Sequence, residues 1–129
     1  MKKYFLILVI AFFSSCNSDD AQVGTEKSLQ GRWSWKGSTG GIAGTTDTPK
    51  STDKVIYLEF SGANFKTYVN GKLTTESPFT IKTQKSVFGG ERPMIVGDFM
   101  TMSFEFKEDK LYLNEECYDC YGSSYIRIN

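Results

Sequence analysis

Apolar and polar residues alternate along most of this chain, from residue 29 to its end. In residues 54–60, for example, Ile56, Leu58 and Phe60 fall on one face, because successive side chains of a strand point to opposite sides. No stretch after residue 28 shows the 3.6-residue period of an amphipathic helix. The pattern therefore predicts an all-β domain.

Glycine, asparagine, aspartate and proline separate these segments, as is typical of turns. Asn70-Gly71 is the strongest hairpin signal, because a type I′ turn requires positive φ at both central residues. Strands are expected within residues 31–36, 54–60, 64–69, 73–85, 93–97, 99–106, 110–114 and 123–128. Eight strands joined mostly by hairpins predict an antiparallel up-and-down barrel. An interior of that size is either just filled by side chains or just holds a small ligand.

The first fifteen residues have a different pattern, with Lys2 and Lys3 ahead of an unbroken apolar run from Tyr4 to Phe13. A spanning helix needs about 20 apolar residues, so this shorter run is typical of a secretion signal and not of a membrane span. The expected organisation is a signal peptide over residues 1–15, a polar flexible tether over 16–28 and a barrel domain over 29–129.

Small residues directly before Cys16 resemble the lipobox of bacterial lipoproteins. That resemblance implies that Cys16 carries lipid, palmitate among its acyl chains, and becomes the first residue of the mature protein. Several acyl chains hold a protein firmly on a membrane, whereas one does so only marginally. The following Asn-Ser-Asp-Asp resembles the acidic tether that directs lipoproteins of some Gram-negative groups to the outer membrane, and often to the cell surface. The alternative is an ordinary signal peptide in which Cys16 is incidental.

Composition excludes several function classes. The chain has no histidine, which removes Ser-His-Asp and Cys-His nucleophile arrangements and histidine-ligated zinc. Its formal net charge is zero, and no basic stripe marks a nucleic-acid binder. We therefore expect a protein that is not an enzyme, uses no cofactor or metal, and binds no nucleic acid.

Gly31, Trp33 and Arg127 resemble the signature of the lipocalin (calycin) family, and especially short bacterial lipocalin-like lipoproteins. The resemblance implies that Trp33 plugs the closed end of the barrel and that Arg127, from the last strand, lies across its ring. The first strand then begins at the closed end, and alternate loops lie at the mouth. These loops are residues 37–53, 70–71, 97–98 and 115–122.

The glycine-rich stretch GSTGGIAGTT would lie at this mouth. It lacks the Gly-Lys-Ser/Thr ending of a phosphate-binding P-loop. Two interpretations remain, a mobile lid with Ile42 as its one apolar anchor and a plain flexible loop. Tyr118 and Tyr121 are also expected near the mouth.

Cys117 and Cys120 form a C-x-x-C pair in the last predicted hairpin. A single pair without histidine cannot complete a tetrahedral zinc site. In an exported protein a local disulfide is expected, with free thiols as the alternative.

Two functions are compatible with these features. In the first, the barrel binds a small hydrophobic molecule between inward side chains, here Trp35, Phe60, Phe65, Phe79, Met102 and Leu113. In the second, the barrel is filled and its tyrosine-bearing loops bind a protein or a glycan at the cell surface. The volume enclosed by the inward side chains separates these hypotheses, because a ligand pocket reaches several hundred Å³.

Overall fold

The computed structural model describes residues 29–128. The predicted signal peptide, Cys16 and the tether lie outside the described residues. Within residues 29–128, no helix is long and apolar enough to cross a membrane.

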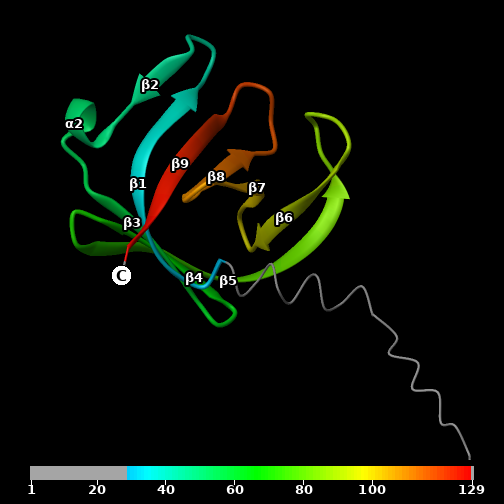
Figure 1. Cartoon of the computed structure of the whole chain (residues 1–129), viewed down its shortest axis with the longest axis horizontal. Helices are drawn as coiled ribbons and strands as arrows, with labels where there is room; N and C mark the ends of the chain where they lie inside the picture. Colours follow the sequence, from blue (N-terminus) through cyan, green and yellow to red (C-terminus); the bar gives the residue numbers. More distant parts are fainter. Residues whose placement is uncertain (1–28, 129) are drawn as a thin grey trace, which may run out of the picture.

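Within that part of the chain, one antiparallel sheet holds all nine strands, and the pairing of β1 with β9 closes it into a barrel (Figure 1). Eight strands form the barrel wall, because β2 pairs only with the far end of β1. The predicted all-β, eight-stranded antiparallel barrel is therefore confirmed, and its geometry is consistent with a lipocalin-like up-and-down barrel. The elements are β1 (Gly31–Gly40), β2 (Thr45–Asp47), α2 (Pro49–Thr52), β3 (Ile56–Ser61), β4 (Asn64–Val69), β5 (Lys72–Lys85), β6 (Glu91–Gly97), β7 (Thr101–Lys107), β8 (Lys110–Glu115) and β9 (Tyr121–Ile128).

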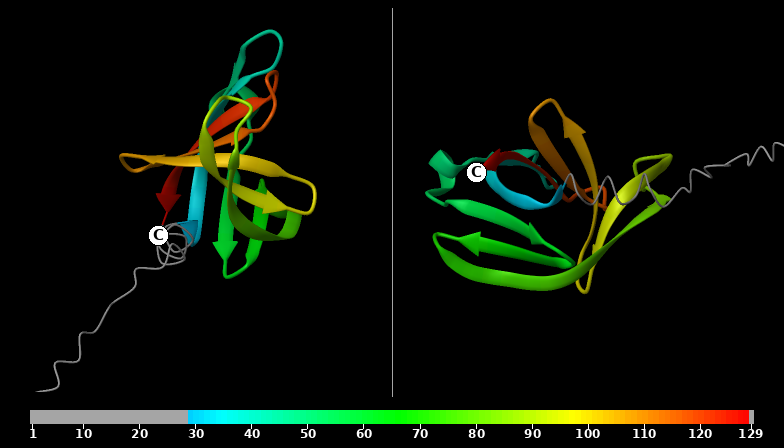
Figure 2. Two further views of the ribbon diagram at one scale, coloured as in Figure 1. Left: turned by 90° about the vertical axis from the view of Figure 1, so that its right-hand side faces the viewer. Right: turned by 60° about the horizontal axis from the view of Figure 1, so that its bottom comes forward.

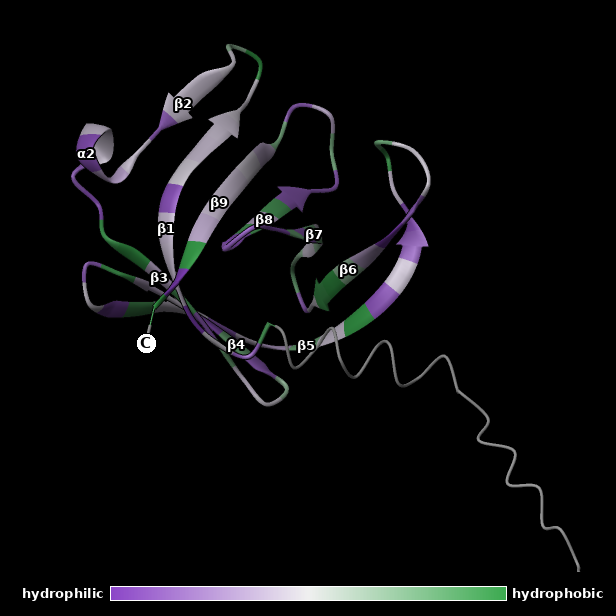
Figure 3. Ribbon diagram, in the orientation of Figure 1, coloured by the Kyte–Doolittle hydropathy of each residue, from purple (hydrophilic) through white to green (hydrophobic). Residues whose placement is uncertain are grey.

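The first half of the glycine-rich stretch is strand, not loop. β1 continues to Gly40, and the β1–β2 hairpin extends past the barrel as a pale ribbon without apolar strand positions (Figure 3). A Cβ at Gly40, where φ is +154°, would collide with the carbonyl group of Cys120 on the neighbouring chain segment. Glycine is needed there because two backbones approach closely, which the sequence alone does not distinguish from flexibility.

The closed end is held by a contact between Trp33 and Arg127. The guanidinium carbon lies 4.3 Å from the centre of the indole ring, and Arg127 Nη1 donates to the carbonyl of Gln30 at 2.7 Å. Trp33 Nε1 donates to the carbonyl of Leu29 at 2.9 Å, so the segment before β1 is fixed beneath the barrel. Gly31 adopts φ +122°, and a Cβ there would lie 2.9 Å from Arg127 Nη1. The glycine of the signature thus makes room for the arginine.

β5 pairs with two different neighbours along its length. Its first half pairs with β4 as far as Pro78, and from Phe79 onward it pairs with β6. The residues before Pro78 therefore have a strand on one side only within the described sheet. Figure 1 shows β5 sweeping away from β4 toward β6.

The bend in β5 corrects the expected loop placement. Gly97 pairs with Phe79, and Asp98 N donates to Ser77 Oγ at 3.2 Å, so the 97–98 turn lies beside the bend and not at the mouth. Conversely, the β5–β6 hairpin tip lies at the same end as the β1–β2 and β8–β9 tips (Figure 2, left). Simple alternation of loops fails because β5 continues beyond β4.

Inside the barrel, aromatic rings form the centre of the core. Phe60 contacts Phe65 and Phe79, with ring centres 5.1 and 5.4 Å apart. The other buried members of this cluster are Leu29, Trp33, Trp35, Leu58, Ile81, Ile95, Phe104, Leu111, Leu113 and Tyr125.

We predict that Arg127→Ala lowers the free energy of unfolding by about 1–2 kcal/mol, because it removes a cation–π contact and a charged hydrogen bond. Arg32→Ala is the matched control. The exposed Arg32 side chain makes a surface ion pair with Glu59 at 3.8 Å and lies 5.9 Å from the centre of the Tyr57 ring, and its loss is expected to matter by only about 0.5 kcal/mol. Urea unfolding measures both. Equal effects of the two substitutions would contradict a special role for Arg127.

Candidate ligand cavity and its rim

The barrel contains an open cavity of about 580 Å³. It opens at the side of the barrel where the first half of β5 pairs with β4 but not with β6. Strands β3 and β4 form one wall, and β7, β8 and β9 form the other. The lining residues are Ile56, Leu58, Phe65, Thr67, Thr75, Phe99, Met100, Thr101, Met102, Leu113, Glu115, Glu116, Cys117 and Tyr125.

The walls combine fixed and adaptable apolar side chains. Leu58, Phe65 and Leu113 are buried in the core and present only part of their surface to the cavity. Met100 and Met102 are partly buried, and methionine adapts readily to ligands of different shape. Such a surface favours apolar molecules without specifying one.

Tyr125 is the principal buried polar group of the cavity wall. Burial raises the pKa of its hydroxyl to about 12, with a smaller lowering by its hydrogen bond to Ser123 and a further raising by the charge of Glu115. The phenol therefore remains neutral near pH 7. The polar contacts continue from Ser123 Oγ to Ser38 Oγ at 2.6 Å, and Trp35 Nε1 donates to Ser38 Oγ at 2.8 Å.

Glu116 ties the β8–β9 loop to the β5–β6 loop. Its carboxylate accepts hydrogen bonds from Ser86 Oγ at 3.0 and 3.1 Å and from the backbone N of Val87 at 2.9 Å. Burial acts to raise the pKa of Glu116, but these hydrogen bonds and the positive charge of Arg92 outweigh it, and the pKa is lowered. The charged form of Glu116 therefore stabilises the contact between these two loops at the rim of the cavity.

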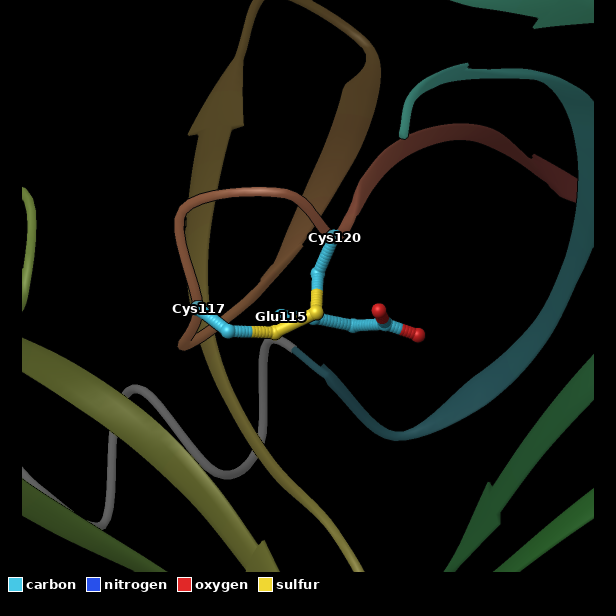
Figure 4. A group of neighbouring side chains, drawn as sticks. All are labelled: Glu115, Cys117 and Cys120. Carbon is cyan, nitrogen blue, oxygen red and sulfur yellow. A yellow bond between two sulfur atoms is a disulfide. The ribbon is translucent and has the colours of Figure 1, made fainter. Parts of the chain in front are cut away.

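Cys117 and Cys120 form the expected disulfide, with Cα atoms 5.4 Å apart (Figure 4). Together with Glu115 they are a group of three potential metal ligands within the described residues. A metal requires cysteine as thiolate, and the disulfide occupies both sulfur atoms. In Figure 4 the Glu115 carboxylate extends beyond the disulfide.

A second depression, of about 590 Å³, lies between the β1–β2 hairpin and the β8–β9 hairpin and shares Glu115 with the cavity. Tyr112, Tyr118 and Tyr121 contribute aromatic surface to it. Its other lining residues are mainly serine, threonine, asparagine and glycine. We call this depression the tyrosine groove.

Of the six residues predicted to line a ligand site, three line the cavity, namely Phe65, Met102 and Leu113. The other predicted lining residues, Trp35, Phe60 and Phe79, belong to the packed core and are not among the lining residues. An inward position in a narrow barrel is more often filled by a neighbouring side chain than open to a cavity.

At the mouth, Tyr118 and Tyr121 line the tyrosine groove, as their predicted position suggests. Ile42 lies in the turn between β1 and β2, is 93% exposed and lines neither depression. Ile42 therefore anchors nothing in the conformation described, in which the hairpin extends past the barrel, and its role as the anchor of a lid stays a prediction.

Sequence reasoning missed the polar contributors to the cavity. Tyr125 lies two positions before Arg127, so strand alternation could have placed it on the same face of β9 as the arginine that covers Trp33. No sequence signal identified Glu115 and Glu116 as lining residues, because their positions depend on where the loop after β8 turns.

Comparison with protein-family models, curated proteins and solved structures finds no match to this chain. Its class is therefore defined by the structure itself. The described residues form a closed, eight-stranded antiparallel β-barrel with a largely apolar cavity in its side.

We predict that Glu116→Gln destabilises the barrel at pH 7. The difference in stability from the wild type should shrink as the pH falls below 4.5, the ordinary pKa of a glutamate carboxyl. A carboxyl whose folded pKa is depressed stabilises the fold above its unfolded pKa and loses that effect as it is protonated in the folded state. Thermal unfolding at several pH values tests this. Glu105→Gln, on the exposed side of β7, is the control. An equal difference at pH 7 and pH 3 would contradict the electrostatic explanation.

Proposed function

We propose that this protein is a non-catalytic binding protein that holds a small hydrophobic molecule in the cavity of its barrel. The observation that supports this most directly is the volume of about 580 Å³ behind mainly apolar walls. Ligand sites are usually clefts of about 300–1,000 Å³ with few polar groups, whereas a filled barrel leaves only smaller voids. Because the cavity is open at the side, part of the ligand would remain in contact with solvent.

Burial of apolar surface would supply most of the affinity. Each CH₂ group removed from water contributes about 0.8 kcal/mol, and the hydroxyls of Thr67, Thr75 and Tyr125 can orient one polar group. Because the side chains of Met100 and Met102 adapt to different shapes, the cavity would discriminate little between apolar ligands of different shape.

The second part of the proposal is that the protein is exported and anchored in the outer membrane through lipid on Cys16. The supporting feature is the lipobox-like sequence before this cysteine. The chain enters the barrel at Leu29, beneath Trp33 and opposite the hairpin tips of β1–β2 and β8–β9. An anchor attached there would leave those tips directed away from the membrane.

Interaction with a protein or a glycan is the second candidate function, and the tyrosine groove is the observation that favours it. Tyr118 is 79% exposed and Tyr121 is 39% exposed, next to neutral groups able to form hydrogen bonds. Tyrosine contributes strongly to interfaces because it combines an apolar ring with a polar end.

We predict saturable binding of a neutral apolar fluorophore, N-phenyl-1-naphthylamine, by a chain comprising residues 17–129, which contains every described strand. Met102→Trp is expected to weaken binding about ten-fold or more, because the larger side chain occupies the cavity. Leu73→Trp is the matched control, since Leu73 is 48% exposed and does not line the cavity. Fluorescence titration measures both affinities, and circular dichroism checks folding.

Binding that is unchanged by Met102→Trp would place the fluorophore elsewhere and contradict the cavity proposal. Absence of binding to the wild type would favour the tyrosine groove as the functional surface. Glycan and protein screens with Tyr121→Ala as the comparison variant would then be the next step.

For the anchor, we predict that the full chain incorporates labelled palmitate in a Gram-negative host and sediments with membranes. Cys16→Ala is expected to remove both properties, because the thiol is the site of lipid attachment. Cys117→Ala is the matched cysteine control and should retain the label. Recovery of the unlabelled wild-type chain in the soluble periplasmic fraction would contradict lipidation and favour an ordinary signal peptide.

A further inference from the structure

The charged residues that line the cavity are all of one sign. Glu115 and Glu116 contribute carboxylates, and no lysine or arginine is among the lining residues of the described chain. The remaining polar lining groups are neutral hydroxyls on Thr67, Thr75 and Thr101, together with Tyr125. The polar part of this site is therefore negative or neutral.

The two carboxylates differ in how many hydrogen-bond partners they have within the protein. Both oxygens of Glu116 accept hydrogen bonds from the β5–β6 loop, and Arg92 supplies a nearby positive charge. Glu115 is exposed at the rim, and its carboxylate accepts one hydrogen bond, from Tyr121 N at 3.2 Å. No ion pair of Glu115 is found within residues 29–128. Glu115 is the carboxylate better placed to meet a ligand.

Glu115 also lies close enough to the buried wall to influence Tyr125. Its charge helps to raise the pKa of this phenol, which stays uncharged near pH 7. A negatively charged ligand group next to Tyr125 would experience the same unfavourable field. A positively charged group would be stabilised by it, since opposite charges attract and this attraction is stronger near a protein surface than in bulk water.

From this distribution of charge we infer that the ligand is an apolar amine or ammonium compound, and not a fatty acid anion. The hydrocarbon part packs between Phe65, Met102 and Leu113, and the positively charged nitrogen lies at the rim by Glu115. This inference rests on the proposed function and adds the chemical class of the ligand. It also separates this site from carriers that pair a fatty acid carboxylate with a cationic side chain, because no lysine or arginine is among the lining residues within residues 29–128.

The test compares three ligands with the same ten-carbon chain: decyltrimethylammonium, decanol and decanoate. Each displaces N-phenyl-1-naphthylamine from the chain of residues 17–129, at low salt and below micelle-forming concentrations. We expect the ammonium compound to bind at least about ten-fold more tightly than decanoate, with decanol between them. Added salt should reduce this difference, because the rim is exposed to solvent.

Glu115→Gln is expected to remove most of the preference for the ammonium compound, because it lowers the affinity for this ligand much more than the affinity for decanol. Glu105→Gln removes the same charge from the exposed side of β7 and should leave the preference intact, which controls for general attraction of cations. Tighter binding of decanoate, or equal effects of the two substitutions, overturns the inference while the proposed function stands. Failure of all three ligands to displace a bound fluorophore overturns both.

Discussion

The closure of the barrel by β1 and β9 is the constraint on which the other features depend. Trp33 and Arg127 face each other across these two strands, directly at the register position that joins them. Gly31 leaves space for the guanidinium group, and Gln30 receives its hydrogen bond. Gln30 also exchanges two hydrogen bonds with Gly62, at 2.7 and 2.8 Å, so the turn between β3 and β4 is fixed to the same end. These contacts thus join the start of β1, the end of β9 and the turn between β3 and β4 at one end of the barrel.

The cavity follows from the change of partner along β5. A strand that paired with β4 and β6 over its whole length would close the wall beside Thr75. Pro78 lies where this change occurs, and proline has no N–H to donate to a ladder. Ser77 compensates at the bend, since its hydroxyl accepts from Asp98 N and donates to the carbonyl of Pro78. The opening is therefore a product of the same residues that stabilise the bend.

Local pattern predicted the strands well and the arrangement of their ends less well. Ile56 to Ser61 and Asn64 to Val69 agree closely with the expected segments, because alternation and turn residues are local properties. The extension of β1 to Gly40 escaped prediction because its glycine serves a close approach to Cys120, a contact distant in sequence. Trp35 and Met102 both occupied plausible inward positions, yet only Met102 lines the cavity. That difference depends on the bend of β5, which no local pattern encodes.

Glu115 and Glu116 show how adjacent residues of one loop serve different purposes. Glu116 uses its charge within the protein, since backbone and side-chain donors from the β5–β6 loop surround it. The disulfide that follows limits how far this loop can move away from β8. With the loop held in this way, Glu115 keeps its charge at a fixed place beside the cavity and the tyrosine groove. A pre-positioned charge loses less entropy on binding than a flexible one, so in the proposed site the structural role of Glu116 would strengthen the effect of Glu115 on ligand choice.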